Sequence, residues 1–184
     1  MSVIKVVAAT ALAGGLSIGI ALYGQQWFDG QFGTSGDRSS VRLTSLPDIR
    51  LPDVNGREVR SSSWAGKVLI LHYWASWCAA CVTDTQLLAQ VQQQYGAGAL
   101  QVVGIAIDQP QAVNAFLLEQ PLPYPILIGG NAAAELSQQL GNRTLGLPFT
   151  VMFDAMGRRV FSHSGELTLA QVTNELARLV PVKK

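Results

Sequence analysis

The sequence predicts an α/β domain in which a mainly parallel sheet is covered by helices on both faces and ends in one antiparallel hairpin. Strand-like segments alternate with helix-like segments through most of the chain. Two of the strands, "KVLILHYWA" and "ALQVVGIAID", are almost continuously apolar, as expected for strands buried on both faces. The 184 residues, 48% of them hydrophobic, suffice for one domain with a real core and a tail.

The expected elements alternate regularly along the chain. Asn55-Gly56, between two short strand-like runs, predicts a first hairpin with a two-residue turn. The third helix is expected to be capped by Asn131 and stopped by Gly141. In chain order after the first hairpin we expect a strand at 67–75, a helix at 78–95, a strand at 99–108, a helix at 111–120, a strand at 126–128, a helix at 131–141, a hairpin at 149–163 that turns at Asp154 to Gly157, and a helix at 168–180.

Residues 1–28 differ in composition from the rest and are predicted to be a signal anchor or a signal peptide. Lys5 precedes an uncharged apolar run from Val6 to Tyr23, which as a helix would be about 27 Å long, close to the roughly 30 Å of a bilayer core. The run exceeds the roughly 7–15 apolar residues of a cleavable signal, and Tyr23 and Trp27 lie where aromatic residues anchor a helix end, which favours an uncleaved anchor. Small residues on either side of Ile20 leave cleavage as an alternative.

Residues 29–46 are predicted to be a flexible linker and residues 47–184 the folded domain, because the stretch up to Ser45 is rich in glycine, serine and charged residues. Lys5 is the side-chain cation next to the apolar run and predicts that the domain lies outside the cytoplasm, in an oxidising compartment. Charge is nearly balanced, with 13 Lys and Arg against 12 Asp and Glu, which argues against a nucleic-acid partner.

The chain has two cysteines, Cys78 and Cys81, in "WCAAC", and such a pair can be a structural staple, part of a metal site or a reacting pair. A structural staple that closes so short a loop would contribute only about 2 kcal/mol. A zinc site wants four ligands, and beyond the cysteines the chain offers only His72 and His163 as imidazoles. A reacting pair fits better, because Cys78 would lie at a helix N-terminus that stabilises its thiolate, while Cys81 would resolve a mixed disulfide. Trp77 would either shield the pair from water or pack as an ordinary aromatic residue at the strand end.

The stretch "VLILHYWASWCAAC" resembles the active-site strand and helix of the thioredoxin-like superfamily. "VVGIAIDQPQAVNAFL" and "LGLPFTVMFDAMGRRV" are similar to the exported TlpA/ResA/DsbE-type thiol-disulfide oxidoreductases, and the likeness covers roughly residues 47–181. It implies a thioredoxin-like fold with an N-terminal hairpin and a central strand-helix insertion. The apolar run from Val6 to Tyr23 predicts an N-terminal transmembrane helix before this fold. The likeness also implies that Pro148 follows a cis peptide bond and lies across from the cysteines.

The resemblance implies a membrane-tethered periplasmic thiol-disulfide oxidoreductase that reduces disulfides in exported proteins through a Cys78/Cys81 dithiol-disulfide cycle. This redox-active disulfide would serve in place of a cofactor or metal. The implied location is the bacterial inner membrane, with a single span, or the periplasm if the N-terminal segment is cleaved. The implied partners are exported proteins such as apocytochrome c and a membrane electron donor of the DsbD or CcdA kind. The direction of electron flow is left open, because the same motif can also oxidise.

The sequence departs from the family pattern at several positions near the cysteines. Thioredoxins usually place a buried Asp where this chain has His72, which would either relay the proton of Cys81 or be an ordinary core histidine satisfied by a backbone partner. Many ResA-like proteins carry a Glu where this chain has Asp84, which would either tune the cysteines or be a solvated helix residue. Ala79-Ala80 replaces the more familiar dipeptides between the cysteines, so the family's redox potential does not carry over.

Two other functions are alternatives for a cysteine pair in this kind of fold. A peroxiredoxin-type thiol peroxidase would have Thr or Ser three residues before its cysteine and Pro seven before it, whereas Cys78 is preceded at these positions by Ala75 and Leu71. A non-catalytic module would bind a metal or an exported partner in the groove around Pro148, with the cysteines as ligands.

Overall fold

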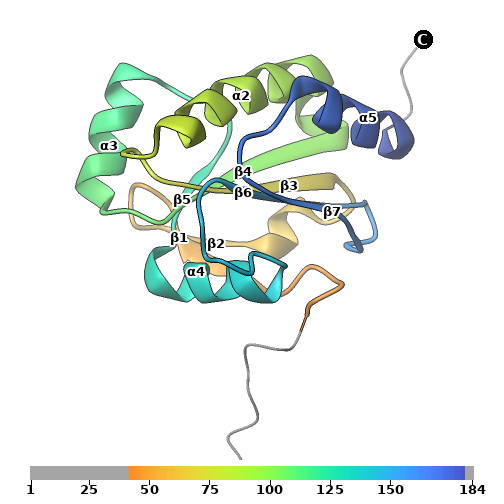
Figure 1. The fold of residues 1–184 in the computed structure, drawn as a ribbon, viewed down its shortest axis with the longest axis horizontal. Coiled ribbons are helices and arrows are strands. Elements are labelled where there is room, and N and C mark those ends of the chain that lie inside the picture. Colours follow the sequence, from red (N-terminus) through yellow and green to blue (C-terminus); the bar gives the residue numbers. More distant parts are fainter. Residues whose placement is uncertain (1–41, 181–184) are drawn as a thin grey trace, which may run out of the picture. The chain divides into compact units, whose positions relative to one another are not determined.

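The computed structural model describes residues 42–180 and contains a five-stranded sheet and a separate two-stranded one (Figure 1). The large sheet has the order β5-β4-β3-β6-β7, in which β3, β4 and β5 are parallel and β6 and β7 form an antiparallel pair next to β3. The strands are β1 (Arg50–Pro52), β2 (Glu58–Arg60), β3 (Val68–Trp74), β4 (Leu100–Ala106), β5 (Ile126–Ile128), β6 (Phe149–Phe153) and β7 (Arg159–Ser164). The helices are η2 (Ser61–Trp64), α2 (Ala79–Ala99), α3 (Pro110–Glu119), α4 (Gly130–Gln139) and α5 (Leu169–Leu179). The predicted α/β fold is confirmed.

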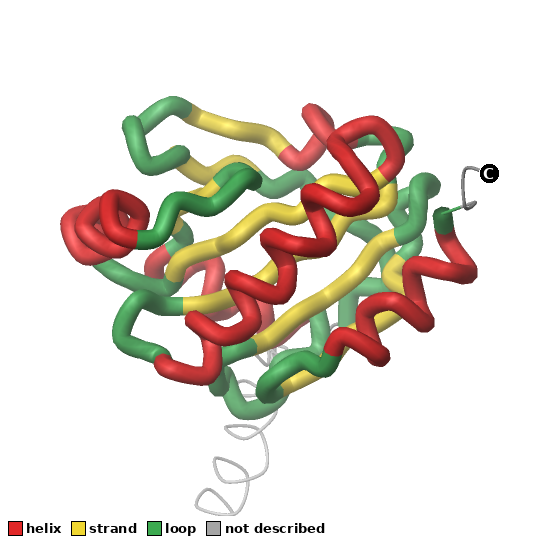
Figure 2. Tube along the Cα trace, turned by 90° about the horizontal axis from the view of Figure 1, so that it is seen from above, coloured by secondary structure: helices red, strands yellow, loops and turns green. Residues whose placement is uncertain are grey.

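Helices cover both faces of the large sheet, as the apolar strands predicted. In Figure 1, α2, α3 and α5 lie on one face, and α4 lies on the other with the β1-β2 hairpin. Figure 2 looks onto the first of these faces and shows α2 crossing the strands with α5 beside it. The side chains of β3 alternate between the two cores: Ile70 and Trp74 face the α2 side, and Leu69 and Leu71 face the α4 side. By this period of two, His72 also faces α2.

The sequence predicted most helix ends, with one error. α2 begins after Cys78, and its regular helix ends at Gly96, which has a φ of 70°. α5 begins with a capping box between Thr168 and Gln171. The prediction of Asn131 as the cap of α4 is wrong, because the N-cap is Gly129. A side chain at Gly129 would run into neighbouring core side chains, so the glycine allows α4 to begin earlier and pack closely on the sheet.

The first hairpin forms where it was expected, but its turn is longer than two residues. The carboxylate of Asp53 accepts hydrogen bonds from the backbone N–H groups of Asn55 and Arg57, at 2.8 and 2.9 Å. Gly56, with a φ of 80°, closes the turn through a bond from its N–H to the carbonyl of Asp53. The side chain of Asp53 therefore organises a wider loop than the Asn-Gly pair alone suggests.

The end of the predicted linker belongs to the folded domain. The N–H of Leu43 donates to the carbonyl of Gln139, and the N–H of Leu46 donates to the carbonyl of Gly157. Both leucine side chains pack against the core on the α4 side, so burial of these two residues draws the segment onto the domain. The predicted anchor or signal at 1–28 and the rest of the predicted linker, 29–41, lie outside the described residues. Within residues 42–180 none of the helices has the length and apolar character needed to cross a membrane.

Candidate active site

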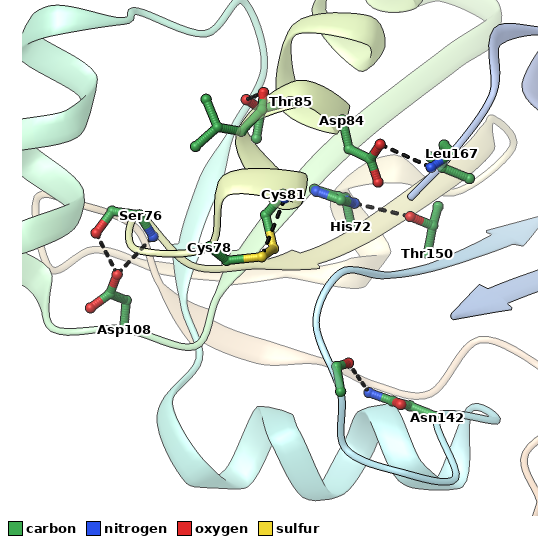
Figure 3. Close-up of a disulfide and its surroundings, with 12 residues drawn as sticks. His72, Ser76, Cys78, Cys81, Asp84, Thr85, Asp108, Asn142, Thr150 and Leu167 are labelled. Atoms are coloured by element: carbon green, nitrogen blue, oxygen red, sulfur yellow. Dashed lines mark hydrogen bonds between the residues drawn. A yellow bond between two sulfur atoms is a disulfide. The ribbon is translucent and has the colours of Figure 1, made fainter. Parts of the chain in front are cut away.

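The two cysteines lie where β3 passes into α2, and a disulfide with an S–S distance of 2.05 Å joins them (Figure 3). β3 ends at Trp74, and the chain then turns so that the N–H of Cys78 donates to the carbonyl of Ala75 at 3.2 Å. This turn delivers Cys78 to the N-cap position of α2. The local sequence thus places the pair at a strand-to-helix junction, as predicted.

The two sulfurs have different surroundings. Cys78 Sγ accepts a hydrogen bond from the N–H of Cys81 at 3.2 Å, so it takes up one of the free donors at the start of the helix. Cys78 is 9% exposed, whereas Cys81 is 0% exposed. The helix dipole and the N–H donor favour negative charge on Cys78. Cys78 is therefore the more exposed residue of the pair, and its sulfur is the one better suited to be a thiolate.

Trp77, directly before Cys78, points into solvent and is 71% exposed. The alternative prediction, that it packs as an ordinary aromatic residue at the strand end, is therefore wrong. The segment before it is fixed by a carboxylate, because Asp108 Oδ2 accepts from both the N–H and the hydroxyl of Ser76, at 2.8 and 2.7 Å (Figure 3).

Sequence reasoning missed Asp108. A usable signal existed, because Asp108 lies two residues after the end of β4, and β3 and β4 are parallel neighbours whose carboxyl ends lie at the same sheet edge.

His72 is fully buried in β3, and its ring lies between Thr150 and the first turn of α2 (Figure 3). Nδ1 is 2.9 Å from the hydroxyl oxygen of Thr150, its direct neighbour on β6. Nε2 has no hydrogen-bond partner among the described residues. Burial lowers the pKa of His72 to about 3, although the backbone of Cys81 favours the charged form. The ring is therefore neutral at pH 7, and its bonded partner is a hydroxyl group rather than the backbone.

Asp84 lies one helical turn after Cys81 and is also fully buried, so its interpretation as a solvated helix residue is wrong. Oδ1 accepts from the N–H of Leu167 at 2.9 Å, while Oδ2 has no partner among residues 42–180. Burial raises the pKa of Asp84 to about 6; the N–H of Leu167 and the charge of His163 act in the opposite direction, and Glu166 adds to the rise. This carboxyl group titrates close to neutral pH.

The expected cis peptide bond is present between Leu147 and Pro148. Phe149 pairs with Tyr73 in the register of β6 and β3, so Pro148 continues β6 alongside the carboxyl end of β3, where the disulfide lies. The buried amide of Asn142 donates to the carbonyl of Gly146 at 2.9 Å and thereby ties the proline loop to the end of α4. The fold thus brings the Pro148 loop and the cysteines to one end of the sheet.

A family model described as Redoxin matches residues 43–176. The chain belongs to the Redoxin family. Relatives of this Redoxin-family chain include the thiol-disulfide oxidoreductase ResA of Bacillus thuringiensis subsp. konkukian, 22% identical over 136 residues that cover 73% of the chain and 76% of the relative. ResA of Geobacillus thermodenitrificans is 25% identical over 148 residues, which cover 79% and 82%. A crystal structure from Chlorobium tepidum, described as a candidate thiol:disulfide interchange protein DsbE, is 27% identical with a TM-score of 0.65 and covers 75% of the chain and 97% of its own.

The relatives and the geometry lead to the same activity. The predicted resemblance to the TlpA/ResA/DsbE type is confirmed, and this Redoxin-family chain is a thiol-disulfide oxidoreductase whose redox group is the Cys78–Cys81 disulfide. The peroxidase and the non-catalytic module are therefore set aside. The roles of His72, Trp77, Asp84 and Pro148 in the reaction remain predictions.

Proposed function

We propose that this protein reduces disulfides in exported proteins, with Cys78 as the attacking sulfur and Cys81 as the resolving sulfur. The observation that carries the proposal is the unequal exposure of the pair, in which a reachable sulfur at a helix N-terminus is backed by a fully buried one. A substrate disulfide can approach Cys78 alone. Cys81 then acts only on the sulfur next to it.

The cycle begins with both cysteines reduced. The Cys78 thiolate attacks one sulfur of the substrate disulfide, which breaks that S–S bond, forms a mixed disulfide and releases the other substrate sulfur as a thiolate that takes up a proton. Cys81 then loses its proton and attacks Cys78 Sγ. The mixed disulfide breaks, the Cys78–Cys81 disulfide forms, and the second substrate thiol leaves. The substrate gains two electrons and two protons, and the protein dithiol is oxidised.

Asp84 is the better candidate to take the proton of Cys81. Its pKa of about 6 leaves it mostly ionised at pH 7 and close to the pH at which a general base is most effective. Its position one turn after Cys81, on the buried side of α2, puts it on the same helix face. His72, with a pKa of about 3, binds a proton only weakly and is suited to be a neutral hydrogen-bonding partner beside Cys81.

The charges next to the pair support reduction as the direction. Asp84 follows Cys81, and Asp108 holds the residue two positions before Cys78. Negative charge near a sulfur disfavours its thiolate, and a dithiol whose thiolate is less stabilised gives up its electrons more readily. The family resemblance adds the proposed substrates, among them apocytochrome c, and an electron donor of the DsbD or CcdA kind that returns the pair to the dithiol.

The apolar run at 6–23 supports a tether to the bacterial inner membrane with the domain in the periplasm. Cell fractionation of the full chain tests the location: a protein found in the soluble cytoplasmic fraction would contradict it.

The redox potential of the Cys78–Cys81 pair, measured against glutathione or dithiothreitol buffers, tests the direction. We expect a value below about −200 mV, in the range of protein reductants. A value near the roughly −120 mV of the strong oxidant DsbA would contradict reduction and make the protein an oxidant. Failure of the reduced protein to reduce any disulfide would contradict the function as a whole.

A further inference from the structure

Thr150 lies at the centre of a short polar row on the sheet face that α2 and α5 cover. It pairs with His72 of β3 on one side and with His163 of β7 on the other. Paired residues of neighbouring strands point to the same face of a sheet, so the three side chains share this face. Thr150 and His72 are both 0% exposed. The hydrogen atoms of their contact must therefore find acceptors within the protein.

The contact between Thr150 and His72 is satisfied in only one arrangement of its hydrogens. Among residues 42–180 the hydroxyl of Thr150 has one hydrogen-bond partner, Nδ1 of His72 at 2.9 Å. The hydroxyl has one hydrogen to donate, and a neutral imidazole carries one on either Nδ1 or Nε2. If Nδ1 held the ring hydrogen, the hydroxyl hydrogen would be buried without an acceptor, which is unfavourable. If the hydroxyl donates to Nδ1, the contact is satisfied and the ring hydrogen lies on Nε2.

The opposite edge of the ring faces Cys81. Figure 3 shows the second ring nitrogen, Nε2, directed toward the first turn of α2. Nε2 has no hydrogen-bond partner among the described residues. Burial lowers the pKa of His72, and the backbone of Cys81 acts against burial, as a nearby carbonyl group does. A carbonyl oxygen can only accept, so both edges of the ring favour a hydrogen on Nε2.

We infer that Thr150 is a positioning residue that keeps the proton of neutral His72 on Nε2, where the ring serves Cys81 as a hydrogen-bond donor. The inference rests on the proposed function and adds a donor to its second step. Asp84 takes the proton of Cys81, and the N–H of His72 then stabilises the thiolate that attacks Cys78 Sγ. His72 keeps its own proton throughout, so it acts as a donor and not as a base.

Other ionisable groups near this region also influence the pH dependence of resolution. They come from α2, from the loop before β5, from β7, from the loop before α5 and from α5 itself: Asp84, Tyr124, His163, Glu166 and the Glu175–Arg178 ion pair. A test of Thr150 must leave them in place. Variants that differ only at position 150 meet this condition.

The first test locates the ring proton of His72 in the full chain. Nitrogen-15 NMR of histidine side chains distinguishes a ring nitrogen that carries hydrogen from one that does not. The chain has two histidines, so His163→Gln leaves the signals of His72 alone. At pH 7 we expect hydrogen on Nε2 and none on Nδ1. Hydrogen on Nδ1 would overturn the inference and leave the proposed function standing.

The second test separates the hydroxyl of Thr150 from the shape of its side chain. Thr150→Val keeps the shape without the hydroxyl, and Thr150→Ser keeps the hydroxyl without the methyl group. The matched control is Thr85→Val, which removes another fully buried threonine hydroxyl, one that donates to the carbonyl of Val82. Each pre-reduced protein is mixed with 5,5′-dithiobis(2-nitrobenzoic acid). The first thionitrobenzoate released reports attack by Cys78, and the second reports resolution by Cys81.

We expect Thr150→Val to slow the second release about fivefold, the size of effect of one hydrogen bond, with a much smaller change in the first release. The second release should also need a higher pH in this variant, because the Cys81 thiolate is less stabilised. Thr150→Ser should resolve at close to the wild-type rate. Thr85→Val should do the same, even where its melting temperature falls.

Equal slowing of the second release by Thr150→Val and Thr150→Ser would overturn the inference, because that pattern marks a packing role. An unchanged second release in Thr150→Val would overturn it as well. In both cases the proposed function would stand. A reduced wild-type protein that releases no thionitrobenzoate would instead overturn the proposed function.

Discussion

The two sides of the Cys78–Cys81 disulfide are built differently. On the solvent side, Trp77 is 71% exposed and Cys78 is just reachable. On the inner side, Cys81, His72 and Asp84 are fully buried between α2 and the sheet. In the proposed function, substrate binding and attack therefore belong to one side of the first turn of α2, and the groups suited to handle a proton lie on the other. Changes on each side should therefore affect different steps.

Burial acts on the two titratable groups of the inner side in opposite directions. It lowers the pKa of His72 and raises that of Asp84, so in both cases the neutral form is favoured. His72 contributes stability above its unfolded pKa of 6.5, and this stability is lost as the pH falls toward about 3. Asp84 contributes stability below its unfolded pKa of 3.8, and this stability is lost as the pH rises toward about 6.

The largest effects should come from the cysteines themselves and would show the division into an attacking and a resolving side. We expect Cys81→Ser to accumulate mixed disulfides with substrate, because attack proceeds and resolution does not. Cys78→Ser should trap few complexes and abolish turnover, because its remaining sulfur is buried. Non-reducing gels after alkylation measure both. Equal trapping by the two variants would contradict the assignment of roles.

Replacement of Asp84 with Asn should affect the second step most strongly. We expect resolution of the mixed disulfide to slow by about 10²-fold, the lower end of the range for general acid–base catalysis, with a much smaller change in attack by Cys78. The pH dependence of resolution near pH 6 should disappear. Stopped-flow measurement of the two phases against pH checks this, and an unchanged resolution phase would exclude Asp84 as the base.

The same Asp84→Asn variant should change stability with a defined sign. From pH 4 to pH 7, its free energy of unfolding should gain about 2 kcal/mol relative to the wild type, because the wild type must ionise a buried carboxyl group and the variant does not. Asp154→Asn is the control of opposite sign. Burial raises the pKa of Asp154, but hydrogen bonds from Arg158 and Met156 outweigh burial and hold this pKa below its usual value. Asp154→Asn should therefore cost more stability at pH 7 than at pH 4. Urea unfolding at the two pH values measures both.

His72→Asn should have a smaller effect on activity than Asp84→Asn and a distinct effect on acid stability. Between pH 7 and pH 4 the free energy of unfolding of the wild type should fall by about 3 kcal/mol, because His72 takes up a proton in the unfolded chain but not in the folded one. The variant should lack this loss. We expect resolution to slow less than tenfold, since a group with a pKa of about 3 is a weak base. A shift of the pH–rate profile near pH 7 in this variant would instead assign the proton relay to His72.

The smallest effects are expected on the solvent side, at the Asp108–Ser76 contact. Asp108→Ala removes the acceptor of two hydrogen bonds and should cost about 1–2 kcal/mol of stability. Ser76→Ala removes one of the two bonds and should cost less. Both should leave Trp77 more mobile, as measured by fluorescence anisotropy, and should change the rate of attack rather than that of resolution. A selective effect on resolution would contradict the separation of the two sides.

The sequence determined the fold and the position of the redox pair. Continuous apolar runs identify β3 and β4, and the alternation of strands and helices implies a parallel sheet covered on both faces. Cys78 could be placed at the start of a helix because it lies four residues after the end of an apolar strand and just before a helix-like segment. These are local properties, since the hydrophobic period and the turn residues act within a few positions of one another.

Tertiary structure alone decided the surroundings of the site. Asp84 looks like a solvated helix residue until α2 is laid on the sheet and the N–H of Leu167, 83 residues away, reaches its carboxylate. The Thr150 partner of His72 lies 78 residues away, and the Asp108 partner of Ser76 lies 32 residues away. The pKa of a side chain depends on how completely water is excluded from it and on which groups replace that water. Those groups come from distant segments, so their identity is fixed only when the layers pack together.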